Sequence, residues 1–270
     1  MAKKNEIQKR QQGKPAKPSL NLTTTGLNSL RKATSSLELP RLFYQLVIFV
    51  IDGSRSMRQP AMNFPSKAQG IDDAIKGVLD RLRSSKNARS FDIGMHVFSN
   101  DFKCVFDAIN LADIPIGQSF NPHQLIDDPG ETMLGECLTD VKLLVRNYLA
   151  RHAEKNAQVL ILLLSDGAIR DYSESLEVAQ SMMADAKVTF ASMYLERLID
   201  DQGDYYSSNE KTGEIDHNSS WTVEEVRMHD HAIGKKFKAF ASRPELSTST
   251  LDPDEIRKHM VKSISMVSKI

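Results

Sequence analysis

The feature that most constrains the fold is an apolar run from Leu42 to Ile51, which ends abruptly in Asp52-Gly53-Ser54-Arg55-Ser56. The apolar residues do not alternate with polar ones, which predicts a strand buried on both faces of a sheet. Ligands of open α/β sheets bind at the carboxyl edge, where this strand ends. Asp52, Ser54 and Ser56 therefore offer a carboxylate and two hydroxyls there, a set that suits a small, hard cation.

Predicted strands and helices alternate along the rest of the chain. Apolar residues at helical spacing predict helices at 71–82, 135–150, 175–186, 231–241 and 254–267. Apolar or alternating runs predict further strands at 91–98, 104–108, 158–164 and 188–194, of which 104–108 is antiparallel at an edge. This order predicts a doubly wound α/β fold of Rossmann-like type. Its sheet is mostly parallel, with one antiparallel edge strand and helices on both faces.

We expect one folded domain, at 39–270. Residues 1–38 are rich in Lys, Gln, Ser, Thr and Pro and hold few large apolar residues, which predicts a disordered basic N-terminal arm. Residues 200–219 are acidic and rich in Gly, Ser and Tyr, and we interpret them as an exposed insertion. The arm is more simply a solubilising tail than a binding element, although its charge leaves nucleic acid open as a partner.

Composition excludes several classes of protein. Lys plus Arg and Asp plus Glu both number 35, so the overall charge indicates no nucleic-acid partner. The two cysteines, Cys104 and Cys137, argue against a disulfide framework, and we expect both to be small core residues. We find no signal peptide and no apolar run near the ~20 residues that span a membrane. A soluble, cytoplasmic protein is the expectation.

Two further segments are predicted to bring oxygen donors to the same sheet edge. Gly130-Glu131-Thr132-Met133-Leu134-Gly135 directly precedes a predicted helix, and Ser165-Asp166-Gly167 directly follows the second buried strand. The Asp-x-Ser-x-Ser pattern alone is a weak signal, since an ordinary polar turn with a helix-capping serine would give it too. Together the three segments favour a metal site.

With these motifs the sequence resembles a von Willebrand factor type A (VWA) domain that has a metal-ion-dependent adhesion site (MIDAS). The resemblance covers about 39–270, and the three motifs occur in the family's order. It implies that Asp52, Ser54, Ser56, Thr132 and Asp166 surround one divalent cation, Mg²⁺ or Mn²⁺. It also implies that the domain captures an acidic residue of a partner protein through that cation.

Within the family, the sequence is similar to the bacterial TerY-type tellurium-resistance proteins. The likeness lies in Leu39-Pro40, in Asp171 beyond the Ser-Asp-Gly motif, and in Ser263-Ile264-Ser265 near the C-terminus. This likeness implies a bacterial stress-response or phage-defence system, in which such proteins accompany a protein kinase and a phosphatase.

Two residues depart from the family pattern, and a third is a candidate for partner contact. Arg55 stands where a glycine commonly separates the serines, and it could attract an acidic partner. Glu131 stands where a glycine commonly precedes the threonine, and it could tighten cation binding. Either could also be an outward side chain without a role. Asp171 could contact the partner, although a loop or helix-cap role is the simpler interpretation.

The donor chemistry favours binding over catalysis, so we expect that the protein is not an enzyme. Serine and threonine hydroxyls are neutral, and with only two nearby carboxylates the cation keeps positive charge and an open position. We find no nucleophile elbow and no phosphate-binding glycine loop. Two alternatives remain. One is a metal-assisted phosphoester hydrolase, for which only Glu131 and Asp171 are candidate bases, and the other is a nucleic-acid module led by the basic arm.

Overall fold

The computed structural model describes residues 41, 43–127, 129–199, 205–208, 215–218 and 221–268. The predicted arm at 1–38 and the Leu39-Pro40 pair lie outside these residues. Among the described residues, no helix combines the length and apolar character that a bilayer crossing needs.

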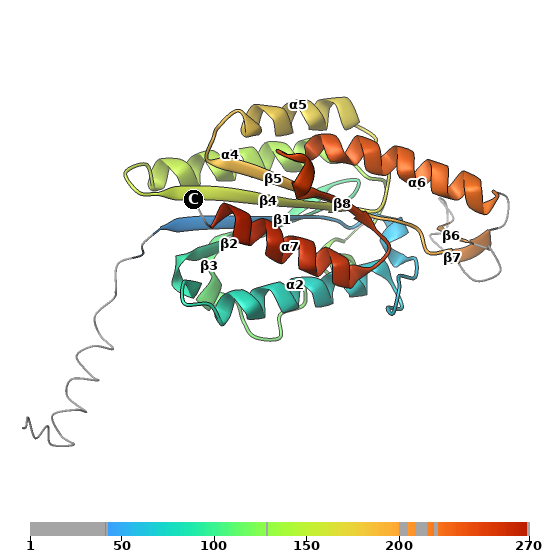
Figure 1. Ribbon diagram of the computed structural model, residues 1–270, viewed down its shortest axis with the longest axis horizontal. Coiled ribbons are helices and arrows are strands. Elements are labelled where there is room, and N and C mark those ends of the chain that lie inside the picture. The colour runs from blue at the N-terminus through green and yellow to red at the C-terminus, as the bar shows by residue number, and fades with distance from the viewer. Residues whose placement is uncertain are drawn as a thin grey trace, which may run out of the picture. The chain divides into compact units, whose positions relative to one another are not determined.

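A six-stranded sheet forms the centre of the domain, in the order β3-β2-β1-β4-β5-β8 (Figure 1). All neighbouring pairs are parallel except β2 and β3, so the predicted mostly parallel sheet with one antiparallel edge strand is confirmed. The strands are β1 (Tyr44–Asp52), β2 (Phe91–Phe98), β3 (Phe102–Asn110), β4 (Ala157–Ser165), β5 (Val188–Leu195) and β8 (Ser247–Thr250).

Strand β1 lies at the middle of the sheet and is buried on both sides, as its largely apolar run without alternation predicts. Every residue from Gln45 to Asp52 is buried. Its neighbours β2 and β4 run parallel to it, with Asp52 opposite Phe98 of β2 and Ile51 opposite Leu164 of β4. The carboxyl ends of the three strands therefore meet at one edge.

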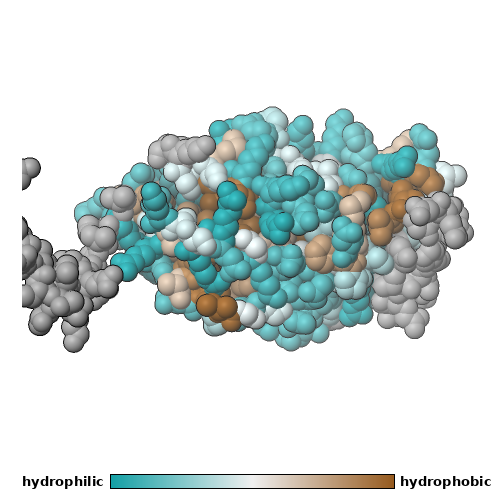
Figure 2. Space-filling view, turned by 60° about the horizontal axis from the view of Figure 1, so that its bottom comes forward, coloured by the Kyte–Doolittle hydropathy of each residue, from teal (hydrophilic) through white to brown (hydrophobic). Residues whose placement is uncertain are grey.

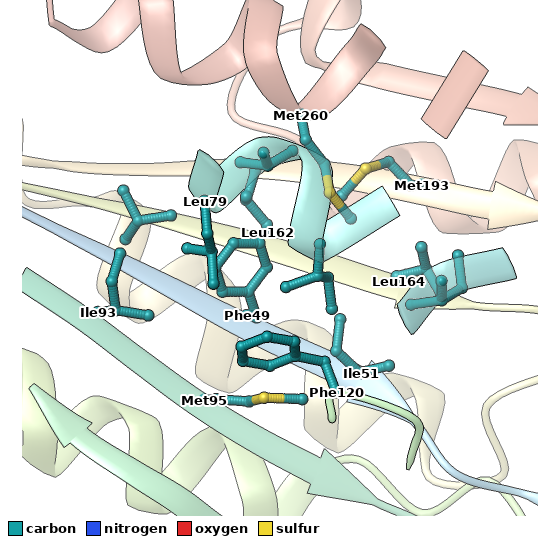
Figure 3. Packing of buried hydrophobic residues seen from close by; sticks show 14 of the residues in the cluster. Phe49, Ile51, Leu79, Ile93, Met95, Phe120, Leu162, Leu164, Met193 and Met260 are labelled. Carbon is teal, nitrogen blue, oxygen red and sulfur yellow. The ribbon is translucent and has the colours of Figure 1, made fainter. Parts of the chain in front are cut away.

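Helices cover both faces of the sheet. On one face α2 (Lys67–Arg83) and α7 (Pro253–Val267) pack against residues such as Phe49 and Leu162, as Figure 3 shows. On the other face lie α4 (Gly135–Arg151), α5 (Tyr172–Met183) and α6 (Val223–Phe237) (Figure 1). The short helix α3 (Pro122–Leu125) and several 3-10 turns, including η1 (Arg55–Arg58), occupy the connections.

The structure differs most from the predicted elements at α6 and β8. Helix α6 begins at Val223 rather than at 231, because Thr222 and Glu225 form a capping box that starts it there. Strand β8 was not predicted, since its four residues are all serine or threonine and carry no apolar pattern. Within 200–219, the described segments β6 (Tyr205–Ser208) and β7 (Ile215–Asn218) pair as antiparallel strands.

The face shown in Figure 2 is largely hydrophilic, with apolar residues in scattered patches. The large apolar side chains that are exposed among the described residues come from separate parts of the chain: Met62, Ile116, Met133, Leu143, Trp221 and Met228.

Candidate metal centre

The ends of β1 and β4 bring the first and third predicted motifs together. Asp52 is the last residue of β1. Ser165 is the last residue of the parallel neighbour β4, and Asp166 follows it directly. The Ser165 hydroxyl donates a hydrogen bond to Asp52 Oδ2 at 2.5 Å. The backbone amide of Ser54 donates to Asp52 Oδ1 at 2.7 Å, so both carboxylate oxygens are held from the protein side.

The two serines link Asp52 to Asp166. Ser54 Oγ and Ser56 Oγ lie 3.0 Å apart, and the Ser56 hydroxyl donates to Asp166 Oδ1 at 2.6 Å. Ser56 lies in the 3-10 turn η1, which folds the chain back at the end of β1. Four of the five predicted ligands therefore form one continuous set of polar contacts.

Thr132 reaches the same place from the connection before α4. A Cβ atom built on Gly167 would lie 3.1 Å from Thr132 Oγ1 and 3.8 Å from Ser56 Oγ, so the two hydroxyls flank this glycine. The loop is held by backbone hydrogen bonds, from Arg170 N to Thr132 O at 3.0 Å and from Met133 N to Ser99 O at 3.0 Å. All five predicted residues therefore converge at the sheet edge.

A cavity of about 470 Å³ opens over this set. Ser54, Ser56, Thr132 and Asp166 line it, whereas Asp52 is completely buried and is not among the lining residues. Arg197 of the β5 end and His229 of α6 also line it, and the sequence reasoning identified neither. Four of the predicted ligands therefore line the same cavity as the Arg197 guanidinium and the His229 imidazole.

The electrostatics of the floor favour a bound cation. Burial, and after it the nearby Asp166 carboxylate, raise the pKa of Asp52 to about 7, against the lowering effect of the hydrogen bonds from Ser165 and Ser54. A carboxyl group with this pKa is energetically costly to keep ionised in the cation-free protein. A divalent cation at this position would remove the cost.

A buried lysine that the sequence reasoning missed partly neutralises the site. Lys67 Nζ lies 2.7 Å from Asp166 Oδ2 and donates to Gln59 Oε1 at 3.2 Å, and the side chains of Lys67 and Asp166 are both fully buried. Lys67 is the first residue of α2 and lies one turn before the buried Ile71, in line with the helix's apolar stripe. A lysine four residues before Ile71, in the register of the helix's buried stripe, is the sequence signal that could have identified Lys67 as buried.

The three candidate partner contacts occupy different positions. Arg55 lines the cavity and donates from Nε to the carbonyl of Pro129 at 3.0 Å. Glu131 also lines it, is exposed, and lies 3.3 Å from Arg170.

Asp171 does not line the cavity. Its carboxylate accepts the amides of Leu134 at 3.0 Å and Gly135 at 2.6 Å, at the N-terminus of α4. This contact satisfies two of the four amides that a helix start leaves without an intrahelical partner, and the carboxylate complements the helix dipole. The helix-cap interpretation of Asp171 therefore agrees with the geometry.

The residues that converge fit a hard divalent cation. Two carboxylates and three hydroxyls supply oxygen donors only, which is the donor type that Mg²⁺ and Mn²⁺ prefer. The hydroxyls of Ser54, Ser56 and Thr132 and the Asp166 carboxylate would face the cation, with Asp52 beneath them.

Comparisons with known proteins agree with the fold. A family model described as von Willebrand factor type A domain matches residues 47–202. A search of curated proteins found no match.

Solved structures with a similar fold include a pilus adhesin, SpaC from Lactobacillus rhamnosus GG. Its TM-score is 0.58 at 11% identity, and the match covers 85% of this chain and 31% of the adhesin. Another is proximal thread matrix protein 1 from the mussel byssus with a zinc-occupied MIDAS motif, with a TM-score of 0.52, 15% identity, and coverage of 90% and 51%.

A third is BatB from Bacteroides thetaiotaomicron, with a TM-score of 0.50, 14% identity, and coverage of 83% and 99%. This chain thus spans about half or less of the adhesin and the mussel protein. At these sequence identities, the likeness to the three solved structures concerns the fold alone.

Proposed function

Because this chain belongs to the von Willebrand factor type A domain family, we propose that it is a metal-dependent protein-interaction module. Asp52, Ser54, Ser56, Thr132 and Asp166 hold one divalent cation, Mg²⁺ or Mn²⁺. When bound, the cation supplies an open coordination position that accepts an Asp or Glu carboxylate of a partner protein. The zinc-occupied MIDAS motif of the mussel protein supports a divalent cation in this fold.

The observation that carries this proposal is the continuous set of contacts between remote segments. Ser56 lies 110 positions from Asp166 in the sequence, yet its hydroxyl is 2.6 Å from the Asp166 carboxylate. Buried polar groups without partners cost free energy, so a fold keeps such a cluster only where its members satisfy one another or a ligand. The cavity above the cluster leaves room for that ligand.

Lys67 makes the charge balance favour capture of an acidic partner. Asp52 and Asp166 carry two negative charges when ionised, and the buried Lys67 cancels one of them. A divalent cation therefore more than neutralises the floor of the cavity and leaves net positive charge facing solvent. Of the three arginines that line the cavity, Arg170 is paired with Glu131 and Arg197 with Asp230, so the net positive charge that attracts a carboxylate comes chiefly from the cation.

The geometry does not favour the hydrolase alternative, and we propose that the protein is not an enzyme. A hydrolase would need a general base beside the cation. Glu131 is an exposed residue that faces Arg170, and Asp171 is bonded to the start of α4. The nucleic-acid alternative depends on the arm at 1–38, which lies outside the described residues.

The biological setting that we propose rests on sequence likeness to the TerY-type proteins. On that basis the module acts in the bacterial cytoplasm, in a stress-response or phage-defence system, and its partners include a protein kinase and a phosphatase. The acidic residue that the cation captures would lie on one of these partners.

Titration with MnCl₂ tests the cation site without knowledge of the partner. Thr132→Val keeps the size of the side chain and removes its hydroxyl, so we expect Mn²⁺ affinity to fall about 10-fold or more. Thr139→Val is the matched control, because its hydroxyl donates to the Gly135 carbonyl within α4 and Thr139 does not line the cavity. Equal Mn²⁺ affinity in both variants and the parent protein would contradict the proposed ligand set.

Capture experiments test the partner's chemistry. Immobilised protein is incubated with bacterial extract in MgCl₂ or in EDTA, and we expect the captured partner only with the cation. Replacement of the partner's contacting Asp or Glu by Ala should abolish capture. A partner that binds equally well in EDTA, or steady phosphoester turnover by the Mn²⁺-loaded protein, would refute the proposed module.

A further inference from the structure

Three side chains of metal-binding type meet on the α4 side of the sheet, apart from the residues at the carboxyl edge. They are His96 of β2, Cys104 of β3 and Asp140 of α4. One ligand atom from each lies within 4.8 Å of the ligand atoms of the other two. His96 Nε2 and Asp140 Oδ2 lie 2.9 Å apart.

The fold itself brings these residues together. Strands β2 and β3 are antiparallel, and their register places His96 directly opposite Cys104. Directly opposite residues on one face of a sheet have neighbouring side chains. Helix α4 packs on the same face, with Cys137, Val141 and Leu144 in the core cluster there. Asp140 lies beside this buried row and is partly exposed, so its carboxylate reaches the His96 ring from the edge.

We propose that His96, Cys104 and Asp140 form a second cation site, selective for Zn²⁺ and similar transition metals over Mg²⁺. An imidazole, a thiolate and a carboxylate are ligands that zinc accepts, whereas Mg²⁺ prefers oxygen donors alone. Three protein ligands leave one of zinc's four positions to water or to a further ligand.

The distances require only small adjustments. Zinc binds nitrogen at about 2.0–2.1 Å, oxygen at about 2.0–2.2 Å and sulfur at about 2.3 Å, which places tetrahedral ligand atoms roughly 3.3–3.7 Å apart. His96 and Asp140 are slightly closer than this, and no pair is farther apart than 4.8 Å. Cys104 is exposed and the Asp140 side chain is 40% exposed, so both can adjust while His96 stays fixed in the core.

The surrounding charge is negative. Partial burial of the thiol, followed by the charges of Asp107 and Asp140, raises the pKa of Cys104 to about 11, although the residue as a whole is exposed. The thiol is therefore protonated in the cation-free protein, and a bound metal must displace that proton. The Asp107 carboxylate also acts electrostatically on His96, and its negative charge favours a cation at this place.

The site is weaker than a closed structural zinc site, for a reason visible in the histidine. Among the residues that the structure describes, His96 Nδ1 is buried and has no hydrogen-bond partner. When Nε2 binds a metal, the ring proton moves to Nδ1, where no carbonyl or carboxylate accepts it. Ligating histidines normally have such an acceptor, and its loss typically weakens metal binding ~10–100-fold. We therefore infer an exchangeable cation.

Cobalt(II) absorption distinguishes this site from the one at Asp52. A thiolate bound to Co²⁺ gives an intense sulfur-to-metal charge-transfer band in the near-ultraviolet, and the donors at the Asp52 site are all oxygen. We expect full-length protein to develop this band on titration with CoCl₂, and ZnCl₂ to remove it by competition. Excess MgCl₂ should leave it unchanged, because Mg²⁺ does not bind thiolate ligands well.

Single-residue variants identify the sulfur. Cys104→Ser is at an exposed position and should abolish the band, whereas Cys137→Ala is the matched control and should keep it. Asp140→Asn should weaken Co²⁺ binding about 10-fold or more, as expected for loss of a ligand.

Three outcomes would overturn the second site. They are the absence of a thiolate band at saturating CoCl₂, a band that persists in Cys104→Ser, and a band that disappears only in Cys137→Ala. None of them affects the proposal for Asp52, because Mn²⁺ binding to oxygen donors is measured separately.

Discussion

Replacement of Asp52 by asparagine should make the cation-free protein more stable at pH 8. The carboxyl group is fully buried, and its pKa is raised to about 7 from the value of 3.8 expected in the unfolded chain. A shift of this size corresponds to a cost of about 4 kcal/mol for holding the group ionised at pH 8. Asparagine has the same size and no charge, so it removes this cost.

The net gain should be smaller than the full cost. Asp52 accepts hydrogen bonds from the Ser54 amide and from the Ser165 hydroxyl. The oxygen of asparagine can keep the first, but its amide nitrogen faces Ser165 as a donor, and bonds to a neutral acceptor are weaker. A loss of about 1–2 kcal/mol leaves an expected net stabilisation of about 2–3 kcal/mol in chelator.

The dependence on pH has a definite sign. Since the pKa of Asp52 is higher in the folded protein, the cation-free folded state binds a proton more strongly than the unfolded chain between about pH 4 and pH 7. The contribution of Asp52 to stability is therefore fully present below pH 4 and is lost as the pH rises through 7. Asparagine does not titrate, so the stability of Asp52→Asn should not fall in this way as the pH rises.

Urea unfolding in EDTA, followed by circular dichroism at pH 5 and pH 8, measures both effects. Addition of MgCl₂ at pH 8 should then stabilise the parent protein, because a ligand that binds only the folded state adds RT ln(1 + [L]/Kd). The free energy of unfolding of Asp52→Asn should rise little on addition of Mg²⁺. The exposed Asp73→Asn on α2 is the charge-matched control and should behave like the parent protein.

One result would refute this reasoning. If Asp52→Asn is less stable than the parent protein in EDTA at pH 8, the hydrogen bonds to the carboxylate outweigh its burial and its repulsion by Asp166. The carboxylate would then be a stabilising group without a cation, and the argument that the fold leaves a charge for a metal to neutralise would fail.

Two further substitutions test the same edge of the sheet. Lys67→Met should destabilise the protein by about 3–5 kcal/mol in EDTA, because it leaves Asp166 without its buried partner, and MgCl₂ should restore part of the loss in a thermal unfolding scan. Lys258→Met, which removes an exposed ion pair with Glu255 within α7, should leave the stability nearly unchanged, and an equal loss in the two variants would contradict the assigned role of Lys67. Gly167→Ala should lower Mn²⁺ affinity in a calorimetric titration, since its Cβ would crowd the Thr132 hydroxyl at 3.1 Å. Gly234→Ala is the control, because its Cβ would meet the Ser249 hydroxyl at the same distance, and it should leave the Mn²⁺ affinity unchanged.

The core of the fold could be predicted because its strands are buried on both faces. The stretches Leu46–Ile51 of β1 and Val159–Leu164 of β4 have no polar interruptions, so they indicate central parallel strands without reference to the partners they pair with. Strand β8 could not be predicted in this way. It has four hydroxyl residues at the sheet edge, and it is a strand because the backbone of β5 offers hydrogen bonds, with Ser192 opposite Ser247.

The start of α6 shows the same limit. Its buried residues, which include Val226, Asp230 and Ile233, have helical spacing, but a buried aspartate in the middle of the row hides the pattern. Asp230 is buried because it accepts hydrogen bonds from the Tyr194 hydroxyl and the Arg197 amide. These hydrogen bonds join α6 to the end of β5, so they form only in the folded chain and leave no local sequence pattern.

The candidate site likewise contains residues that the sequence predicted and one that it did not. Asp52, Thr132 and Asp166 were predicted to share one edge because each follows a strand or precedes a helix at a known place, and they do converge. Lys67 was missed because a lysine at a helix start is usually exposed, and its burial depends on Asp166, which lies 99 positions away in the sequence.

The two cysteines had been predicted to be small core residues. For Cys137 this is confirmed, and for Cys104 it is wrong, since that residue is exposed. The edge position of β3 explains the difference, because side chains on an edge strand have a neighbouring strand on one side only. His96 and Cys104 are near each other only through the register of that strand, which no local pattern specifies.

Donor chemistry would keep the two proposed cations apart, even though zinc could enter either site. Divalent transition metals generally bind a given site more tightly than Mg²⁺ does, so zinc can compete at the oxygen donors around Asp52. The imidazole and thiolate of His96 and Cys104 suit zinc far better than magnesium, and limiting zinc would therefore bind there first. The buried Lys67 adds to this separation, because its charge weakens every cation at Asp166 while leaving the thiolate site untouched. At low zinc and millimolar magnesium, the edge of the sheet would then hold Mg²⁺ and the thiolate site would hold zinc.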